Sequence, residues 1–257
     1  MTKPSLACYI IACQDDTDVL GNALRSVGTV ADTILLVDTG LGSKYQYPRT
    51  TQPTVKEFFL ETTAEGRYSV TYTNQVSLYG GEDRELATTP GRTVRLKIDY
   101  SQALNHIGQL LKDYDWVLRL DSDEMLSREL VADLPDYLAG LPSNVVTIAP
   151  YLLTLWPSMD MTSYARNYSQ ALTHGRIYRP LKIGWRNPIH EHQDYDGERV
   201  VWPRWWLHFR QIFQKRCIRQ NGHGGDAWAN MSADIRPVSE LNVSWEPIVI
   251  PDEEHDA

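Results

Sequence analysis

The chain has 257 residues, 42% of them hydrophobic and 23% charged, which is enough apolar material for the core of one large domain or two small ones. This balance excludes a chain that is disordered over most of its length. The formal net charge of −8 argues against a broad electrostatic interaction with nucleic acid, because phosphate binding needs a basic surface.

The sequence predicts no membrane-spanning helix, because it contains no run of about 18 apolar residues. No basic leader with a cleavage site precedes the apolar run Leu6–Cys13. We therefore expect a cytoplasmic protein, with peripheral contact at the inner face of the membrane as the alternative. The three cysteines lack the spacing of metal ligands, and buried thiols are the expectation for them.

The first forty residues have the pattern of a βαβ unit. Residues 6–12 form a continuous apolar run, typical of a strand buried on both faces. Residues 17–27 then repeat apolar side chains at helical spacing, and residues 33–37 form a second buried strand. Strand, helix and strand in this order predict parallel pairing and an α/β fold class with a mostly parallel central sheet.

The pattern after residue 40 is less regular and becomes clear again near residue 100. The predicted elements are a helix over 55–61, a strand over 68–74, a polar loop over 80–92, a helix over 101–112, a strand over 116–120, a helix over 127–138, a strand over 144–155 and a closing helix over 207–219. An acidic tail begins at Trp245. The strand over 116–120 leads directly into Asp121-Ser122-Asp123.

Acidic residues follow three of the predicted strands. Asp15 follows the first strand, Asp38 ends the second, and Asp121 with Asp123 follow the strand over 116–120. Parallel strands end at one rim of the sheet, where ligands bind. Two carboxylates separated by one residue offer the hard oxygen ligands that Mg²⁺ and Mn²⁺ favour. A solvated turn or a helix cap is the alternative for such a pair, and the position at a strand end favours the ligand site.

Two parts of the chain resemble family-two GT-A glycosyltransferases. Ile11-Ala12-Cys13-Gln14-Asp15-Asp16 and the segment ending in Val37-Asp38-Thr39-Gly40 are similar to the branch related to lipopolysaccharide-core β-glucosyltransferases, whose second strand ends in V-D-T-G. Residues 99–105 and 115–124 resemble that branch's D-F-S-x-A-R-N and D-W-(apolar)-L-D-A-D-E segments. His190-Glu191 resembles the H-E pair of the family.

The resemblance implies a single GT-A, Rossmann-like catalytic domain over residues 1–245. Its nucleotide-sugar-binding half would cover 1–130, its acceptor-binding half 131–245, and an acidic tail 246–257. The implied activity is that of a hexosyltransferase that moves a sugar from a nucleotide-diphosphate donor, with a UDP-sugar favoured, to an acceptor hydroxyl with inversion. Mn²⁺ or Mg²⁺ is the implied cofactor, and a glycan or a lipid-linked sugar is the implied acceptor.

The resemblance also implies roles for individual residues. The donor-binding residues would be Gln14, Asp15, Asp38, Asn105, Asp121 and Ser122. Asp121 and Asp123 would hold the cation, with His208 as a third ligand or, alternatively, as a structural histidine. Glu191 would be the general base that takes the proton of the acceptor hydroxyl. Competing candidates for the base are Asp194, Asp196 and Glu124.

Three other functions fit parts of the sequence. One is a non-catalytic carbohydrate- or nucleotide-binding protein on the same fold, and another is a transferase acting on modified DNA, which the acidic charge disfavours. A metal oxygenase built around His190, His192 and a carboxylate would need an all-β barrel, which the βαβ start contradicts. Trp202, Trp205 and Trp206 are expected to pack in the core, with one or two contacts to an acceptor.

Overall fold

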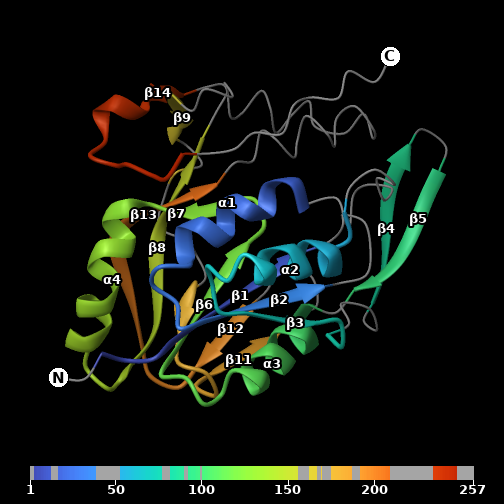
Figure 1. Cartoon of the computed structure of the whole chain (residues 1–257), viewed down its shortest axis with the longest axis horizontal. Helices are drawn as coiled ribbons and strands as arrows, with labels where there is room; N and C mark the ends of the chain where they lie inside the picture. Colours follow the sequence, from blue (N-terminus) through green and yellow to red (C-terminus); the bar gives the residue numbers. More distant parts are fainter. Residues whose placement is uncertain are drawn as a thin grey trace.

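The computed structural model of the protein describes residues 3–12, 17–38, 53–76, 82–89, 92–98, 100–155, 162–166, 169, 175–186, 192–208 and 234–247. An eight-stranded sheet runs through this part of the chain, with helices on both of its faces (Figure 1). The helices are α1 (Thr17–Val27), α2 (Val55–Ala64), α3 (Tyr100–Leu110), α4 (Arg128–Gly140) and the 3-10 helix η3 (Val238–Glu240). The strands are β1 (Leu6–Ala12), β2 (Thr33–Asp38), β3 (Val70–Thr73), β4 (Glu82–Thr89), β5 (Arg92–Ile98), β6 (Trp116–Asp121), β7 (Glu124–Leu126), β8 (Val145–Thr154), β9 (Ser163–Ala165), β10 (Ile177–Tyr178), β11 (Ile183–Arg186), β12 (His192–Tyr195), β13 (Glu198–His208) and β14 (Ile235–Pro237).

The sheet has the order β3-β2-β1-β6-β10-β8-β13-β7. Its first four strands pair in parallel. Strands β1, β2 and β6 are buried along almost their whole length, as continuous apolar runs predict for strands covered on both faces. The predicted βαβ start and the predicted strand before Asp121 are therefore confirmed.

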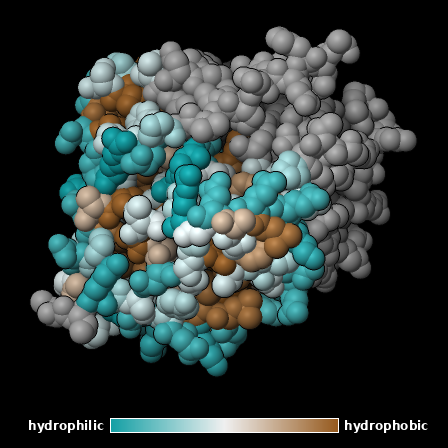
Figure 2. Space-filling model, viewed as in Figure 1, coloured by the Kyte–Doolittle hydropathy of each residue, from teal (hydrophilic) through white to brown (hydrophobic). Residues whose placement is uncertain are grey.

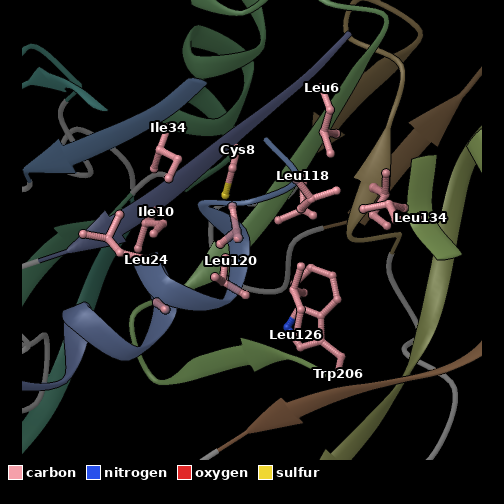
Figure 3. Packing of buried hydrophobic residues seen from close by; sticks show 14 of the residues in the cluster. Leu6, Cys8, Ile10, Leu24, Ile34, Leu118, Leu120, Leu126, Leu134 and Trp206 are labelled. Carbon is pink, nitrogen blue, oxygen red and sulfur yellow. The ribbon is translucent and has the colours of Figure 1, made fainter. Parts of the chain in front are cut away.

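Strand β1 contributes side chains to two separate cores. Leu6, Cys8 and Ile10 pack in the core that α1, α2 and α4 cover (Figure 3). Ala7 and Tyr9 point the other way and pack with α3 and β11. Because alternate residues of a strand face opposite sides of the sheet, both layers hold β1 in place. Packing on both faces of the sheet thus fixes the position of β1, including its carboxyl end.

The other half of the sheet is mixed. Strand β10 lies antiparallel between β6 and β8, β13 pairs in parallel with β8, and β7 pairs antiparallel with β13. The register between β13 and β8 shifts between Trp202 and Trp205, around Pro203, which has no backbone N–H for the ladder. Four of the seven strand pairs are parallel, which confirms the predicted α/β class with a mostly parallel sheet.

Two predicted elements differ from the structure. The predicted polar loop over 80–92 is wrong, because β4 and β5 form an antiparallel hairpin that makes its own two-stranded sheet. Such a hairpin needs no continuous apolar run, which is why its polar sequence indicated a loop. The predicted helix over 207–219 is wrong at its start, because Leu207 and His208 continue β13 through pairing with β7 and β8. The rest of that segment lies outside the described residues.

The chain returns to α4 near residue 245, where the predicted tail begins. Ser244 Oγ donates to Glu129 at 2.6 Å, and Arg128 donates to Glu246 at 2.9 Å. None of the helices in the described ranges is long and apolar enough to cross a membrane. On the face shown in Figure 2, apolar residues form separate patches between hydrophilic ones.

Candidate functional site

The strand order indicates a ligand-binding position at the ends of β1 and β6. Apart from the separate β4–β5 hairpin, the chain builds the sheet outward from β1 through β2 to β3, and then continues on the other side of β1 with β6. In doubly wound sheets, ligands bind beyond the carboxyl ends of the strands at this reversal. The described acidic residues at that position are Asp38, at the end of β2, and Asp121, at the end of β6.

Strand β1 separates these two aspartates. Ala12 is the register partner of Asp38, and Ile11 is the partner of Asp121. Neighbouring strands lie about 4.8 Å apart, so the backbones of the two aspartates are roughly 10 Å apart. Gln14 and Asp15, predicted to follow β1 between them, lie outside the described residues.

Tyr72 of β3 holds the carboxylate of Asp38. Its hydroxyl donates to Asp38 Oδ2 at 2.6 Å, and its ring packs against Phe59 of α2 with ring centres 5.5 Å apart. Burial, the hydrogen bond to Asp38 and the charge of Asp38 together raise the pKa of Tyr72 to about 12. Tyr72 therefore remains a hydrogen-bond donor at neutral pH and orients Asp38 at the rim.

The Asp121 carboxylate lies between two arginines. Arg176 Nη2 donates to Asp121 Oδ2 at 3.0 Å, and Arg119 Nη2 donates to Asp121 Oδ1 at 3.4 Å. Burial by itself would raise the pKa of Asp121, but the charges of Arg176 and Arg119 outweigh it and hold that pKa well below its ordinary value. Asp121 is therefore an ionised carboxylate, and 34% of its side chain is exposed at the rim.

Glu124 is the first residue of β7, directly after the turn that follows β6, and only 2% of its side chain is exposed. Its Oε2 accepts from the backbone N–H of Asp121 and from Nε1 of Trp206, both at 2.9 Å. Its Oε1 accepts from Arg176 Nη2 at 2.7 Å. Burial raises the pKa of the Glu124 carboxyl to about 7, against the opposing charge of Arg176. Because both oxygens are engaged inside the protein, Glu124 supports the turn and is poorly placed to act as the general base.

Arg119 of β6 lies opposite Arg176, the residue that precedes β10. The Arg119 N–H donates to the Arg176 carbonyl at 2.8 Å, and the two side chains are only 7% and 13% exposed. The Arg119 guanidinium also lies 5.8 Å from the centre of the Trp185 ring. Like charges directly opposite each other repel, and the ionised Asp121 between the two arginines supplies a compensating charge, while Glu124 accepts a hydrogen bond from Arg176. We refer to Arg119, Asp121, Glu124 and Arg176 as the ion cluster.

Asp123 and His208 meet beside the ion cluster. His208 Nε2 and Asp123 Oδ2 lie 3.1 Å apart, and both side chains are mostly buried. A carboxylate and an imidazole are suitable ligands for Mn²⁺, and adjacent ligands in an octahedral site with bonds of about 2.1 Å lie about 3.0 Å apart. The pair therefore fits two adjacent ligands of one divalent cation. Within the described ranges no cluster of three potential metal ligands occurs, so substrate oxygens and water would have to complete such a site.

Asn105 and Ser122 were both predicted to bind the donor, and their surroundings differ. Asn105 Nδ2 donates to the Trp185 carbonyl and its Oδ1 accepts from the Trp185 N–H, both at 3.0 Å. Its amide thus connects α3 to β11. Ser122 is buried within the turn between the two aspartates. Glu191, the predicted base, lies outside the described residues.

Two aspartates compete with Glu191 for the role of base: Asp194 on β12, and Asp196 in the turn between β12 and β13. Asp194 is paired with Arg186 across this hairpin, and both side chains are exposed. The Asp196 N–H donates to the Lys182 carbonyl at 3.3 Å, which closes the end of the hairpin. For Asp194 this pairing favours a structural role.

Gly175 sets the position of Arg176. A Cβ at residue 175 would lie 1.7 Å from Thr147 Oγ1 of β8, so any other residue would require the Thr147 side chain or the backbone at 175 to move. Gln193 of β12 also fixes this glycine, because its Oε1 accepts from the Gly175 N–H and its Nε2 donates to the Gly175 carbonyl, both at 2.8 Å. The backbone that leads into Arg176 is therefore packed against β8 and held from β12.

Three residues that contribute to this site were not predicted from the sequence. Arg119 gave a signal, because it is the one charged residue inside the apolar run 116–120, and a buried charge needs a partner. Arg176 and Trp206 gave no such signal. They lie 55 and 82 residues along the chain from their partners Asp121 and Glu124, and reach them only through the pairing of β10 and β13.

Comparison with known proteins gives similarity only to solved structures. No family model and no curated protein sequence matches the chain. The structure of S. aureus TarS, residues 1–349, is similar over 84% of this chain and 63% of its own, with 11% identity and a TM-score of 0.41. GalNAc-T7, crystallised with UDP, GalNAc and Mn²⁺, is similar over 60% of this chain and 23% of its own, with 13% identity and a TM-score of 0.40.

A third structure is glucosyl-3-phosphoglycerate synthase from Mycobacterium tuberculosis in complex with Mn²⁺, UDP and glucosyl-3-phosphoglycerate. It is similar over 58% of this chain and 44% of its own, with 13% identity and a TM-score of 0.31. The chain thus spans less than two thirds of the length of each of these three structures. These are distant likenesses in architecture, over part of each molecule.

Proposed function

We propose that the protein is a GT-A glycosyltransferase, which transfers a sugar from a nucleotide-diphosphate donor to an acceptor hydroxyl. The observation that carries this proposal is the pairing of Asp123 with His208 at 3.1 Å, next to the ionised Asp121 at the carboxyl end of β6. This arrangement lies where a doubly wound sheet binds its ligand, and it offers a cation site for a diphosphate.

The donor would lie across the ends of β2, β1 and β6. Asp38, oriented by Tyr72, is suited to accept hydrogen bonds from the base and ribose of a nucleoside. Asp121, roughly 10 Å away on the other side of β1, is suited to accept from hydroxyls of the donor nearer the diphosphate. Gln14 and Asp15 are assigned to the nucleoside on the sequence resemblance alone. A UDP-sugar remains the favoured donor.

Asp123 and His208 are the residues that we assign to a divalent cation, Mn²⁺ or Mg²⁺. Asp121 is the weaker ligand candidate, because Arg176 and Arg119 already compensate its charge. When bound, the cation would stabilise the negative charge that develops on the departing nucleoside diphosphate. Asp123 and His208 would bind and orient it, and the buried turn around Glu124 would hold their geometry.

The chemical step is assigned as a single inverting displacement. Glu191 takes the proton of the acceptor hydroxyl while the hydroxyl oxygen forms a bond to the anomeric carbon of the sugar. The bond between that carbon and the diphosphate oxygen breaks, and its electrons leave with the nucleoside diphosphate. A glycan or a lipid-linked sugar is the proposed acceptor, bound by residues from 131–245.

The test is calorimetric titration of UDP, GDP and their sugar conjugates, with and without Mn²⁺, on the wild type and on Asp123→Ala. We expect UDP and UDP-sugar to bind more tightly with Mn²⁺, and Asp123→Ala to remove that dependence. The matched control is Asp133→Ala on α4, which should bind as the wild type does. Absence of binding of every nucleotide, with and without Mn²⁺, would overturn the proposal.

Release of free UDP from a bound UDP-sugar separates a transferase from a binding protein on the same fold. We expect slow release by the wild type, with water as the acceptor, and loss of release in Glu191→Gln while the affinity for UDP-sugar is kept. Unchanged binding with no release by the wild type, even when candidate glycan acceptors are added, would favour the non-catalytic function.

A further inference from the structure

Arg176 has a position in the ion cluster that distinguishes it from Arg119. One nitrogen, Nη2, donates both to Asp121 Oδ2 at 3.0 Å and to Glu124 Oε1 at 2.7 Å. Arg119 reaches Asp121 only at 3.4 Å, near the outer limit of a hydrogen bond. Hydrogen bonds between charged groups are strong at short distance, so Arg176 is the residue that fixes the Asp121 side chain.

Glu124 anchors Arg176 from the other side. Its second oxygen binds the backbone N–H of Asp121 and the indole of Trp206, both at 2.9 Å. Glu124 therefore holds Asp121 twice, directly at its backbone and through Arg176 at its carboxylate. Since Trp206 is fully buried, this set of bonds has little freedom to rearrange.

The charges explain why Arg176 is needed. Asp121 and Glu124 are carboxylates that approach the same guanidinium nitrogen, and Glu124 has almost no contact with solvent. Without Arg176 the Asp121 carboxylate would lose its shorter charged hydrogen bond, and its side chain, which is partly exposed, would be free to turn away. The donor hydroxyls would then meet a carboxylate in the wrong orientation.

We infer that Arg176 is a positioning residue for donor binding, which acts by holding the Asp121 carboxylate in the orientation that the nucleotide sugar needs. This inference rests on the proposed function. Arg176 does not contact the donor itself, and its effect passes entirely through Asp121. This dependence can be measured, because substitution of Arg176 should have little further effect once Asp121 has been substituted.

The experiment is a double-mutant cycle on the affinity for UDP in the presence of Mn²⁺, with the wild type, Arg176→Met, Asp121→Asn and the double variant. We expect Arg176→Met to weaken binding by roughly 10- to 100-fold, as loss of residues that orient a binding group typically does. In the Asp121→Asn background the same change should weaken binding by no more than about twofold. Arg204→Met on β13, which loses only an exposed ion pair with Asp133, is the matched control and should bind as the wild type does.

Arg176→Lys keeps the proposal testable if Arg176→Met fails to fold. Lysine retains the charge, but its side chain is shorter and lacks the fixed donor geometry of a guanidinium, so we expect a smaller loss of affinity than with methionine. Equal losses for Arg176→Met in both backgrounds would mean that Arg176 contacts the donor directly, and would overturn the inference. Wild-type affinity in both Arg176 variants would also overturn it, while the proposed function would stand. Failure of the wild type to bind any nucleotide would overturn both.

Discussion

The two halves of the central sheet contribute to the site in different ways. Strands β1, β2, β3 and β6, the parallel half, bring Asp38 and Asp121 to one rim simply because each residue ends its own strand. The mixed half consists of β7, β8, β10 and β13. Trp206 and His208 of β13, and Arg176 directly before β10, surround the turn after β6. The parallel half provides a place for the ligand, and the mixed half fixes the side chains that would bind it.

The residues that fix the geometry of the site are therefore the ones whose roles are hardest to predict from the sequence. A strand end is a local property of the sequence, whereas the partners of Glu124 come from two separate strands. Substitutions in the mixed half should therefore both weaken UDP binding and lower stability. Substitutions in the core of the parallel half should lower stability alone.

The largest expected effect is that of Trp206→Ala. We expect it to lower the free energy of unfolding by about 3–5 kcal/mol, through loss of a fully buried ring, and also to weaken UDP binding because Glu124 loses a donor. Leu24→Ala, in the same core but on α1, should cost about 2–5 kcal/mol and leave UDP affinity within about twofold. Urea unfolding and calorimetry measure both quantities. Equal effects of the two changes on affinity would contradict the division between the halves.

The second prediction concerns pH. The pKa of Glu124 is about 7 in the folded protein and ordinarily 4.5, so between these values the folded state keeps a proton that the unfolded chain has lost. The contribution of Glu124 to stability is then greatest below pH 4.5 and falls by about 3 kcal/mol as the pH rises to 7. Glu124→Gln should lack this slope when the two proteins are unfolded in urea at each pH without divalent cations. Parallel pH profiles for the two would contradict the assignment.

The third prediction separates the two halves by their dependence on metal. His208→Ala should weaken UDP binding about tenfold with Mn²⁺, or about 1.4 kcal/mol, and leave binding without Mn²⁺ unchanged. Asp38→Asn should weaken binding by a similar factor with and without Mn²⁺, because Asp38 is assigned to the nucleoside. Calorimetry with and without Mn²⁺ gives, for each variant, the ratio of its affinity for UDP to that of the wild type. If the two variants showed the same metal dependence, one of the assignments would be wrong.

The smallest expected effect concerns the turn between β10 and β11. Leu181 has a φ of 64°, and among the described residues it alone has a positive φ without being glycine. This conformation costs a leucine about 1–2 kcal/mol, part of which the greater chain entropy of glycine offsets. We expect Leu181→Gly to raise the free energy of unfolding by about 0.5–1 kcal/mol. Leu181→Ala, which removes the exposed side chain and keeps the strain, is the control, and an equal gain in both would contradict this reason.

The parallel half of the fold could be predicted from sequence because its signals are local. The apolar runs at 6–12, 33–37 and 116–120 each become a buried strand, and residues 17–27 become α1. Strand β10 has only two residues, too few for any periodicity to indicate it. The continuation of β13 to His208 depends on pairing with β7 and β8, which no local pattern reports.

The candidate site divides in the same way. Asp38, Asp121 and Asp123 could be predicted because each one lies at or just after a strand end, and their roles remain predictions. That Asn105 connects α3 to the Trp185 backbone, and that Glu124 is buried against Trp206, depends on contacts between distant segments. The sequence shows which strand ends carry charged residues, but it does not show which of those charges pair with one another in the folded protein.

Gly175 has a consequence for how this protein can vary. A side chain at this position would overlap the Thr147 side chain, so either Thr147 or the backbone that leads into Arg176 would have to move. In a library containing every single substitution, residue 175 should therefore be as intolerant as Asp123, although no donor atom is assigned to it. If glycine is invariant at this position among functional variants, the reason would be the close packing of residue 175 against β8. In an alignment of functional variants, a residue constrained by packing would thus be as invariant as a residue that binds the ligand.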